Sequence, residues 1–343
     1  MKILHVLASN RFAGAERVAV NIIKNMPEHD CTYVSPPGPI EEQLGNLGIS
    51  YYLIDELTPW NMRKVINYFQ PDIVHAHDYR ASVMSVFSGE NRKIISHLHC
   101  NYPWADRINP KTCLYGFTIP KYQRIITVSQ AIREDFVFSN RIKTRATVLH
   151  NVIDVQQILS SSLEQTVAGA ELLFMGRLTL QKDPLAFISL VAELKKHNPE
   201  IRAIMLGEGE LKSSCIHEIE RLDLQNSIEL LGFKSNPFPY AAAAKLLVMT
   251  SRWEGFALTA MEALSLGKPV VAYNNGGFKE VVKDGETGYL CNSFTEMFEK
   301  VSILLENQDL LQEMGRQAQQ WSAEKNNMEN YISSLKKIYG INR

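Results

Sequence analysis

Short β-rich apolar runs alternate with helical patterns along almost the whole chain, and this alternation limits the fold more than any other feature. In the first half the strand candidates are Ile3–Leu7, Cys31–Ser35, Tyr51–Ile54, Ile73–His75, Ile94–Leu98 and Ile125–Val128. Those in the second half are Glu171–Met175, Arg202–Leu206, Ile228–Leu230, Leu246–Met249 and Val270–Tyr273. Strands that alternate with helices pair into parallel sheets with helices on both faces. The sequence therefore predicts an α/β protein with doubly wound parallel sheets.

One segment interrupts this rhythm and marks a domain boundary. Residues Asp154–Ala170 are rich in Ser and Gln, and the strand and helix pattern restarts after them. A chain of 343 residues suits two domains of roughly 150 residues better than one core. We therefore expect a first domain over 1–165 and a second over 166–325, with a cleft between them. The helical tail from about 326–343 can pack back onto the first domain.

The charge balance and the cysteines exclude several classes of protein. Lys and Arg total 36 against 37 Asp and Glu, so no global basic field favours nucleic acid as a partner. The first apolar run is too short for a signal peptide and reads as a buried strand, and no run approaches the ~20 residues of a membrane-spanning helix. We expect a cytoplasmic protein with reduced cysteines, because these are scattered without metal-ligand spacing. They are Cys31, Cys100, Cys113, Cys215 and Cys291.

The most informative stretch, Trp253–Leu264, follows a predicted strand that ends near Thr250. Residues Ala257–Leu266 are good helix formers, and Gly267 supplies the expected stop. The free amides and the dipole at the start of such a helix form a site for a diphosphate. The amides that we expect to contact such a diphosphate are those of Gly255, Phe256, Ala257 and Leu258.

Two glutamates flank this helix start. Glu254 lies just before it, where a carboxylate can accept hydrogen bonds from sugar hydroxyls, and Glu262 lies about two turns along, where it can bind a ribose diol. A glutamate taken singly is usually a solvated surface carboxylate. The Gly-Phe start, the small residues of the helix and the position at a strand end together favour a binding site.

With these residues in place, the chain resembles the retaining glycosyltransferases of family 4, which have the GT-B fold. Their hallmark of Glu, seven residues and Glu is met by Glu254 and Glu262. The resemblance implies two Rossmann-like domains facing a central cleft, a nucleotide-sugar donor and retention of the anomeric configuration. It extends through Phe12–Arg17, Pro71–His77, Leu98–His99, Val128–Ser129, His150–Asp154, Gly176–Leu178, Lys182, Gly207–Gly209, Gly276–Gly277 and Gly285–Gly288.

Two cations follow the first strand of the second domain. Arg177 and Lys182 lie in a turn at that strand end, and the sequence has no acidic pair of the Asp-x-Asp type to hold a divalent ion. Fixed charges can stabilise a leaving diphosphate through charge-assisted hydrogen bonds. The resemblance assigns both residues this role and implies that neither a metal nor a cofactor besides the nucleotide sugar is needed. Surface salt bridging is the alternative.

The loop Ala8–Glu16 after the first strand runs into a helix and offers a second anion-facing helix start. Gly14 and Ala15 are its candidate donor-binding residues. The family that the chain resembles usually carries two adjacent glycines where this chain has Ala13 and Gly14, so close approach of the backbone is left to Gly14. An ordinary turn explains this loop equally well.

Four histidines lie near strand ends of the first domain: His75, His77, His97 and His99. We expect no metal site, since no pair has an evident acidic partner or loop placement. Alternation along the strand places His97 and His99 on one face, and by resemblance His99 matches the position that touches the donor sugar. The other three suit structural roles, and Asn151, at a strand end, is a further candidate for donor binding.

Gly207-Glu208-Gly209 looks like part of a dinucleotide fingerprint, but Lys212 stands where the third glycine should be, so a nicotinamide site is excluded. By resemblance the loop at Gly207 shapes the nucleotide pocket, and Phe233 and Lys234 lie near the base.

Residues 101–151 carry eight basic against three acidic side chains, interleaved with aromatic residues. Such a surface suits docking on an anionic bilayer or a lipid-diphosphate acceptor, and an ordinary mixed solvated surface explains it equally well.

The predicted function is therefore retaining, metal-independent glycosyl transfer. The donor is expected to be a UDP-sugar and the acceptor a glycan or lipid-linked glycan of cell-surface polysaccharide synthesis, by resemblance alone. Two alternatives remain: an epimerase of nucleotide sugars with the same fold, and a non-catalytic protein that binds them. The sequence does not reveal the sugar, the linkage or the oligomeric state.

Overall fold

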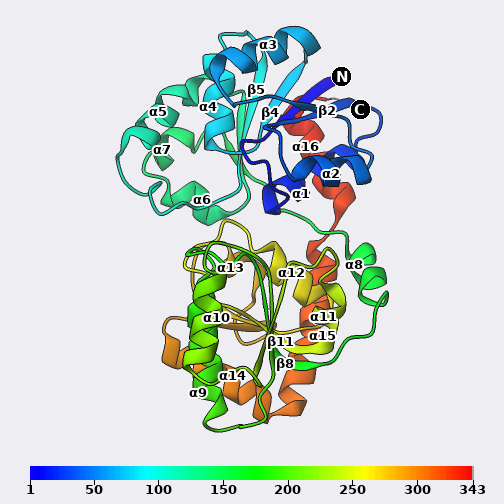
Figure 1. Cartoon of the computed structure of the whole chain (residues 1–343). Coiled ribbons are helices and arrows are strands. Elements are labelled where there is room, and N and C mark those ends of the chain that lie inside the picture. Colours follow the sequence, from blue (N-terminus) through cyan, green and yellow to red (C-terminus); the bar gives the residue numbers. More distant parts are fainter. Residues whose placement is uncertain (342–343) are drawn as a thin grey trace. The chain divides into compact units, whose positions relative to one another are not determined.

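The computed structural model describes residues 1–341 and consists of two compact units, each built on one parallel sheet (Figure 1). The first unit comprises Met1–Asn151 together with the C-terminal segment from Met328, and the second comprises Val152–Asn327. The predicted α/β class with two doubly wound sheets is confirmed. All five cysteines are free. No helix within 1–341 is both long enough and apolar enough to cross a bilayer.

The first unit has a seven-stranded parallel sheet in the order β3-β2-β1-β4-β5-β6-β7. Because the strand order reverses between β1 and β4, the loops that follow these two strands diverge at the carboxyl edge, where open α/β sheets bind ligands. The strands are β1 (Lys2–Val6), β2 (Asp30–Ser35), β3 (Tyr51–Leu53), β4 (Ile73–Ala76), β5 (Lys93–Leu98), β6 (Arg124–Thr127) and β7 (Ala146–Val148).

The helices of this unit begin where the sequence supplies caps. Thr58 caps one helix through Asn61 N, Asp78 another through Ala81 N, and Asn109 a third through Lys111 N and Thr112 N. Proline at the first helical position strengthens two of these starts. The helices are α1 (Gly14–Lys24), α2 (Ile40–Asn46), α3 (Pro59–Phe69), α4 (Tyr79–Phe87), α5 (Pro110–Thr118), α6 (Gln130–Asp135) and α7 (Ser139–Ile142), with a 3₁₀ turn at Ile119–Lys121.

The C-terminal helix α16 (Met328–Tyr339) packs on the first unit rather than on the second (Figure 1). Leu335 and Tyr339 are fully buried, and the Tyr339 hydroxyl lies 2.6 Å from Nδ1 of His75 on β4. At the helix surface Lys336 forms a salt bridge of 2.5 Å with Glu28. The last helix of the chain therefore completes the core of the unit in which the chain begins.

The second unit has a six-stranded parallel sheet in the order β10-β9-β8-β11-β12-β13, with the reversal between β8 and β11. Its central strands are almost wholly apolar, as expected for strands covered on both faces. The strands are β8 (Ala170–Met175), β9 (Ala203–Leu206), β10 (Ile228–Gly232), β11 (Ala244–Met249), β12 (Val270–Tyr273) and β13 (Gly288–Cys291). The helices are α8 (Val155–Ser162), α9 (Pro184–Lys195), α10 (Lys212–Arg221), α11 (Phe238–Ala243), α12 (Leu258–Ser265), α13 (Phe278–Val281), α14 (Phe294–Glu306) and α15 (Gln308–Lys325).

The division between the units falls after Asn151, earlier than the boundary at residue 165 that the sequence suggested. The Ser- and Gln-rich segment in which the boundary was expected forms α8, which is capped by Asp154 and buries Ile158. This helix packs on α11 and α12, and Asn236 Nδ2 donates to the Ser161 carbonyl at 2.8 Å. Its contacts therefore place it in the second unit.

We expect Leu335→Ala to lower the free energy of unfolding by about 2–5 kcal/mol, because it leaves a cavity where a fully buried side chain packs. Urea unfolding of the full chain measures the change. Lys337→Ala, on the exposed side of the same helix, is the control and should change stability little. Equal effects of the two substitutions would contradict the packing of α16.

Candidate functional site

Two loops of the second unit meet where its strand order reverses. Gly176–Asp183 follows β8, and Thr250–Ala257 follows β11, the neighbouring strand. Arg252 N donates to the Gln181 carbonyl at 2.8 Å, and Gln181 Nε2 donates to the Trp253 carbonyl at 3.1 Å. These bonds join the two loops into one polar surface at the ligand-binding edge of the sheet.

Lys182 and Glu254 form an ion pair across these loops. The Lys182 ammonium donates to Oε1 of Glu254, and the two side chains are only 14% and 7% exposed. The sequence predicted both as site residues, and the structure brings them into contact. Removing one partner of a buried ion pair leaves the other charge uncompensated and typically costs about 3–5 kcal/mol. Each therefore holds the other in position.

Arg177 is the exposed cation of the same loop. Its Nη2 donates to Oε1 of Gln181 at 3.1 Å, and no carboxylate within 1–341 forms a salt bridge with it. Arg252 differs, because its Nε donates to Oδ2 of Asp183 at 2.7 Å. The guanidinium of Arg177 thus keeps its full charge available for an anionic ligand.

Asp183 and Thr250 anchor the start of α9, and the sequence analysis missed both. Asp183 adopts a left-handed backbone with φ 48°, which a short polar residue tolerates better than most. Thr250 Oγ1 donates to the carbonyls of Lys182 and Asp183 at 3.1 and 2.8 Å. A polar residue directly after an apolar strand was the signal available for Thr250.

The loop that precedes α12 is buried and closely packed. Gly255, Phe256 and Ala257 are buried, and a Cβ on Gly277 would lie 2.5 Å from the Gly255 carbonyl oxygen. Ala257 has no side chain that could cap the helix. The amide of Leu258, which we expected to be available to a diphosphate, donates to the Phe256 carbonyl at 2.8 Å in this tight turn.

Glu262 lies in α12 and is 1% exposed, while Glu254 is 6% exposed. The interpretation of these glutamates as solvated surface carboxylates is therefore wrong. Burying a carboxylate costs free energy unless a partner compensates it, and the Lys182 ammonium is that partner for Glu254.

The loop after β9 packs directly against the cationic loop. Gly207 has φ 140°, and a Cβ there would lie 1.9 Å from the Gly176 carbonyl oxygen. Leu178 N donates to the Glu208 carbonyl at 2.9 Å. Only glycine allows the two backbones to approach so closely.

Phe233 and Lys234 follow β10, the edge strand beside β9. Phe233 is 65% exposed, and the Lys234 ammonium lies 5.8 Å from the centroid of the Tyr240 ring. Gly207 N donates to the Gly232 carbonyl at 2.9 Å, which ties this loop to the Gly207 loop. An exposed aromatic ring at a strand end is available for stacking on a base.

In the first unit, two carboxylates hold the loop after β1. Oδ2 of Asp78 accepts from Ala8 N at 3.0 Å while Oδ1 caps α4, and Oε2 of Glu16 accepts from Ala13 N at 3.1 Å. Burial raises the pKa of Asp78, and it raises that of Glu16 to about 7. The sequence analysis missed both as site residues. An acidic residue directly after a strand and a glutamate three residues after a helix cap were the available signals.

The predicted donor-binding residues of this unit lie at different depths. Gly14 is exposed at the first position of α1, and Ala15 is half-buried beside it. Asn151 is buried, and its Oδ1 has no hydrogen-bond partner within residues 1–341. A buried amide oxygen without a partner is uncommon in a folded protein and suits a site that a ligand completes.

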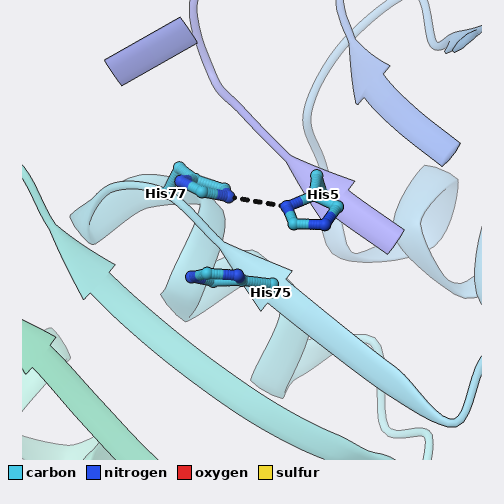
Figure 2. Close-up of side chains that lie close together, drawn as sticks. All are labelled: His5, His75 and His77. Carbon is cyan, nitrogen blue, oxygen red and sulfur yellow. Dashed lines mark hydrogen bonds between the residues drawn. The ribbon is translucent and has the colours of Figure 1, made fainter. Parts of the chain in front are cut away.

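Five histidines gather on one face of the first sheet, including His5, which the sequence analysis did not single out. His5 pairs with His75 in the register of β1 and β4, and His77 follows β4 directly (Figure 2). His97 lies on β5, and His99 follows it. Burial lowers the pKa of all five, so the imidazoles are neutral.

In the group of His5, His75 and His77, the ring geometry favours hydrogen bonding over metal binding. Nitrogens of His5, His75 and His77 lie within 4.8 Å of one another, as do those of His77, His97 and His99. An imidazole binds an ion in the plane of its ring at about 2.1 Å. The His75 and His77 rings stack at 4.1 Å with planes 25° apart, so no point at that distance lies in both planes. Hydrogen bonds of 3.0–3.1 Å account for the close contacts instead.

Comparison with known families covers most of the chain. The model for Glycosyltransferase Family 4 matches residues 12–157, and that for Glycosyl transferases group 1 matches residues 158–321. The chain is 31% identical over 236 residues to an uncharacterised glycosyltransferase of Methanocaldococcus jannaschii, covering 62% of this chain and 58% of that one.

A second relative is the N-acetylgalactosamine-N,N'-diacetylbacillosaminyl-diphospho-undecaprenol 4-alpha-N-acetylgalactosaminyltransferase of Campylobacter jejuni. It is 28% identical over 242 residues, covering 68% of this chain and 66% of that one. The chain thus spans less than two thirds of the length of both relatives.

Among solved structures, Anabaena HepE in complex with UDP has a TM-score of 0.87 and 21% identity, covering 99% of this chain and 100% of that one. HepE in complex with UDP-glucose gives a TM-score of 0.85. These likenesses establish the GT-B fold.

We expect Gly207→Ala to destabilise the protein by about 1–3 kcal/mol, because its Cβ would overlap the Gly176 carbonyl and force the two loops apart. Thermal unfolding measures the loss. Gly45→Ala is the control, since α2 has open space around Gly45 and alanine favours a helix. If both substitutions left stability unchanged, the close approach of the loops would be refuted.

Proposed function

Because the chain belongs to the glycosyltransferases of family 4 and group 1, we propose that it is a retaining enzyme that moves a sugar from a UDP-sugar to a glycan or lipid-linked glycan. The observation that carries this proposal is the buried pair of Lys182 and Glu254 beside the exposed Arg177. All three lie where the strand order of the second sheet reverses.

Arg177 and Lys182 stabilise the leaving diphosphate. As the bond between the sugar C1 and the diphosphate oxygen breaks, negative charge grows on the diphosphate, and Arg177 and Lys182 stabilise it through charge-assisted hydrogen bonds. Lys182 is held in position by Glu254, so little reorganisation accompanies the reaction. Fixed cations of this kind make a divalent metal unnecessary, and we propose that the enzyme needs none.

Glu254 suits a binding role better than a nucleophilic one. Its Oε1 already accepts a hydrogen bond from an ammonium, which lowers its nucleophilicity, while its second oxygen can accept from a sugar hydroxyl. Glu262 is the proposed partner of the ribose diol, and Phe233 the aromatic surface for the base. The acceptor hydroxyl then attacks C1 on the face that the diphosphate leaves, and a phosphate oxygen takes its proton.

The choice of donor and acceptor rests on relatives. HepE was solved with UDP and with UDP-glucose, and the C. jejuni relative is named as acting on a diphospho-undecaprenol-linked sugar. These names favour a UDP-sugar and a lipid-linked acceptor, with a role in polysaccharide synthesis.

A surface of the first unit supports contact with a membrane that carries such an acceptor. Ile108, just before α5, is 71% exposed, and Phe117, in the last turn of α5, is 73% exposed and stacks on Phe87 at the end of α4. Lys111 and Lys121 are exposed on the same segment. Exposed apolar side chains beside lysines favour binding to an anionic bilayer, and we propose that the protein associates peripherally through α5.

We expect UDP to bind more tightly than GDP or ADP in buffer with EDTA, as measured by titration calorimetry. Arg177→Met and Lys182→Met should each weaken UDP binding about 10- to 100-fold, because each removes one charge-assisted contact to the diphosphate. Lys196→Met, at the exposed end of α9, is the matched control and should have no effect. An absolute requirement for Mg²⁺ or Mn²⁺, or full binding by both variants, would refute this donor site.

Incubation with UDP-sugars, with and without a lipid-linked acceptor, then separates transfer from epimerisation, and NMR of the product gives its anomeric configuration.

We expect Ile108→Ser combined with Phe117→Ser to reduce binding to phosphatidylglycerol vesicles about tenfold or more, because two apolar side chains no longer enter the bilayer. Flotation of protein with vesicles measures this. Trp60→Ser, which removes an equally exposed aromatic ring from α3, is the control. Similar loss in both proteins would contradict docking through α5.

A further inference from the structure

We propose that His5 and His77 are positioning residues that fix the tautomer of His99, so that His99 offers an Nδ1–H donor to a sugar oxygen. The placement of His99 at the sugar rests on the proposed function and on the family resemblance that assigns His99 to the donor sugar, whereas its tautomer follows from the first unit alone. The imidazoles of His5, His77 and His99 form a row. Nδ1 of His5 lies 3.0 Å from Nε2 of His77, and Nδ1 of His77 lies 3.0 Å from Nε2 of His99.

This repeated geometry links the tautomers. Each neutral imidazole has one N–H donor and one acceptor nitrogen, and every contact in the row joins Nδ1 of one ring to Nε2 of the next. If His5 carries its proton on Nδ1, then His77 and His99 must do so as well, because each Nε2 has to accept. If His99 carries its proton on Nε2, the other two must do the same. Only these two states satisfy both hydrogen bonds.

The rings can form such a row because they are neutral. Burial lowers the pKa of His5, His77 and His99 far below its usual range. A protonated ring would be a donor at both nitrogens and would leave the row without an acceptor at that position.

The two ends of the row decide between the states. His5 Nε2 and His99 Nδ1 are both buried atoms without a hydrogen-bond partner within residues 1–341. His5 is completely buried, whereas His99 is partly exposed after β5. The all-Nε2–H state would leave an orphaned donor in the core at His5, and buried donors without a partner are rarer than buried acceptors without one. The all-Nδ1–H state leaves only a lone pair at His5 and moves the donor without a partner to Nδ1 of His99, the partly exposed residue, where a sugar oxygen or a water molecule can accept from it.

The chemical consequence concerns the role of His99. With Nε2 occupied by His77 and Nδ1 protonated, the ring can donate a hydrogen bond to a sugar oxygen but has no free nitrogen with which to take a proton. His99 is therefore a neutral donor rather than a general base.

A second row on the same face provides an internal control. His75 Nε2 lies 3.1 Å from His97 Nδ1, and His75 Nδ1 lies 2.6 Å from the Tyr339 hydroxyl. His75 stacks on His77 at 4.1 Å and forms no hydrogen bond with it within residues 1–341. A change at His75 thus alters packing around the first row while keeping its hydrogen bonds.

The test is a long-range ¹H–¹⁵N correlation spectrum of the full chain labelled with ¹⁵N-histidine, without ligand, which separates protonated from unprotonated ring nitrogens. The chain has nine histidines, and single substitutions assign them. We expect His5, His77 and His99 all to be Nδ1–H. Different tautomers within the row, or Nε2–H at His99, would overturn the proposal on the unaltered protein.

Three variants separate the hydrogen bond from packing. His77→Leu removes the donor to His99, and we expect the Nε2–H fraction of His99 to rise about fivefold. His77→Asn has a similar size to leucine but keeps an amide donor near the position of Nδ1, so it should restore the Nδ1–H form. His75→Leu should leave His99 unchanged. Equal effects of His77→Leu and His75→Leu would show that packing alone sets the tautomer. Failure of UDP to bind would refute the donor site and leave this result standing.

Discussion

The ion pair of Lys182 and Glu254 fixes the positions of the charged loops in the second unit. It joins the loop after β8 to the loop after β11, at the point where the strand order reverses. Because both side chains are largely buried, separating the pair would leave a charge without its partner at a high cost in free energy. The ion pair therefore holds the two loops together more firmly than a solvent-exposed pair would. The neighbouring bonds from Gln181, Thr250 and Arg252 depend on that same register of the loops.

Much of the fold was predictable because the hydrophobic periodicity of a strand or a helix depends on residues that are close together in the sequence. The predicted strands fall within a residue or two of β1–β6 and β8–β12, and the helix after Glu254 was placed within one residue of α12. The strands β7 and β13 were missed, since both lie at a sheet edge and Ala146–Val148 and Gly288–Cys291 are only partly buried, so they lack the continuous apolar run of a central strand. The segment with α8 was taken for the domain boundary because its polar composition hides its buried apolar position, Ile158. Its place in the second unit depends on α11 and α12, which are distant in sequence.

The candidate site also has features that local sequence predicts and features that it does not. Glu254, Lys182 and Arg177 could be found because charged residues at strand ends stand out from their apolar surroundings. Their pairing could not be predicted, since position 182 and position 254 are brought together only by the neighbouring strands β8 and β11. The role of His5 was hidden for the same reason. A single histidine in a buried strand looks like a core residue, and only the register of β1 with β4 places it in a row with His77 and His99.

In both units a carboxylate holds the loop beside the reversal of strand order, but the group that it binds differs. In each sheet a carboxylate follows the strand beside the reversal and binds the loop across it: Asp78 after β4, and Glu254 after β11. Asp78 accepts from the neutral amide of Ala8, whereas Glu254 accepts from a lysine, so only the second unit carries a cation at this position. An anionic diphosphate is therefore favoured at the second sheet, while neutral imidazoles and backbone amides at the first suit an uncharged sugar. The seven-stranded and the six-stranded sheet thus both have a carboxylate beside the reversal of strand order, and they differ in the charge of its partner.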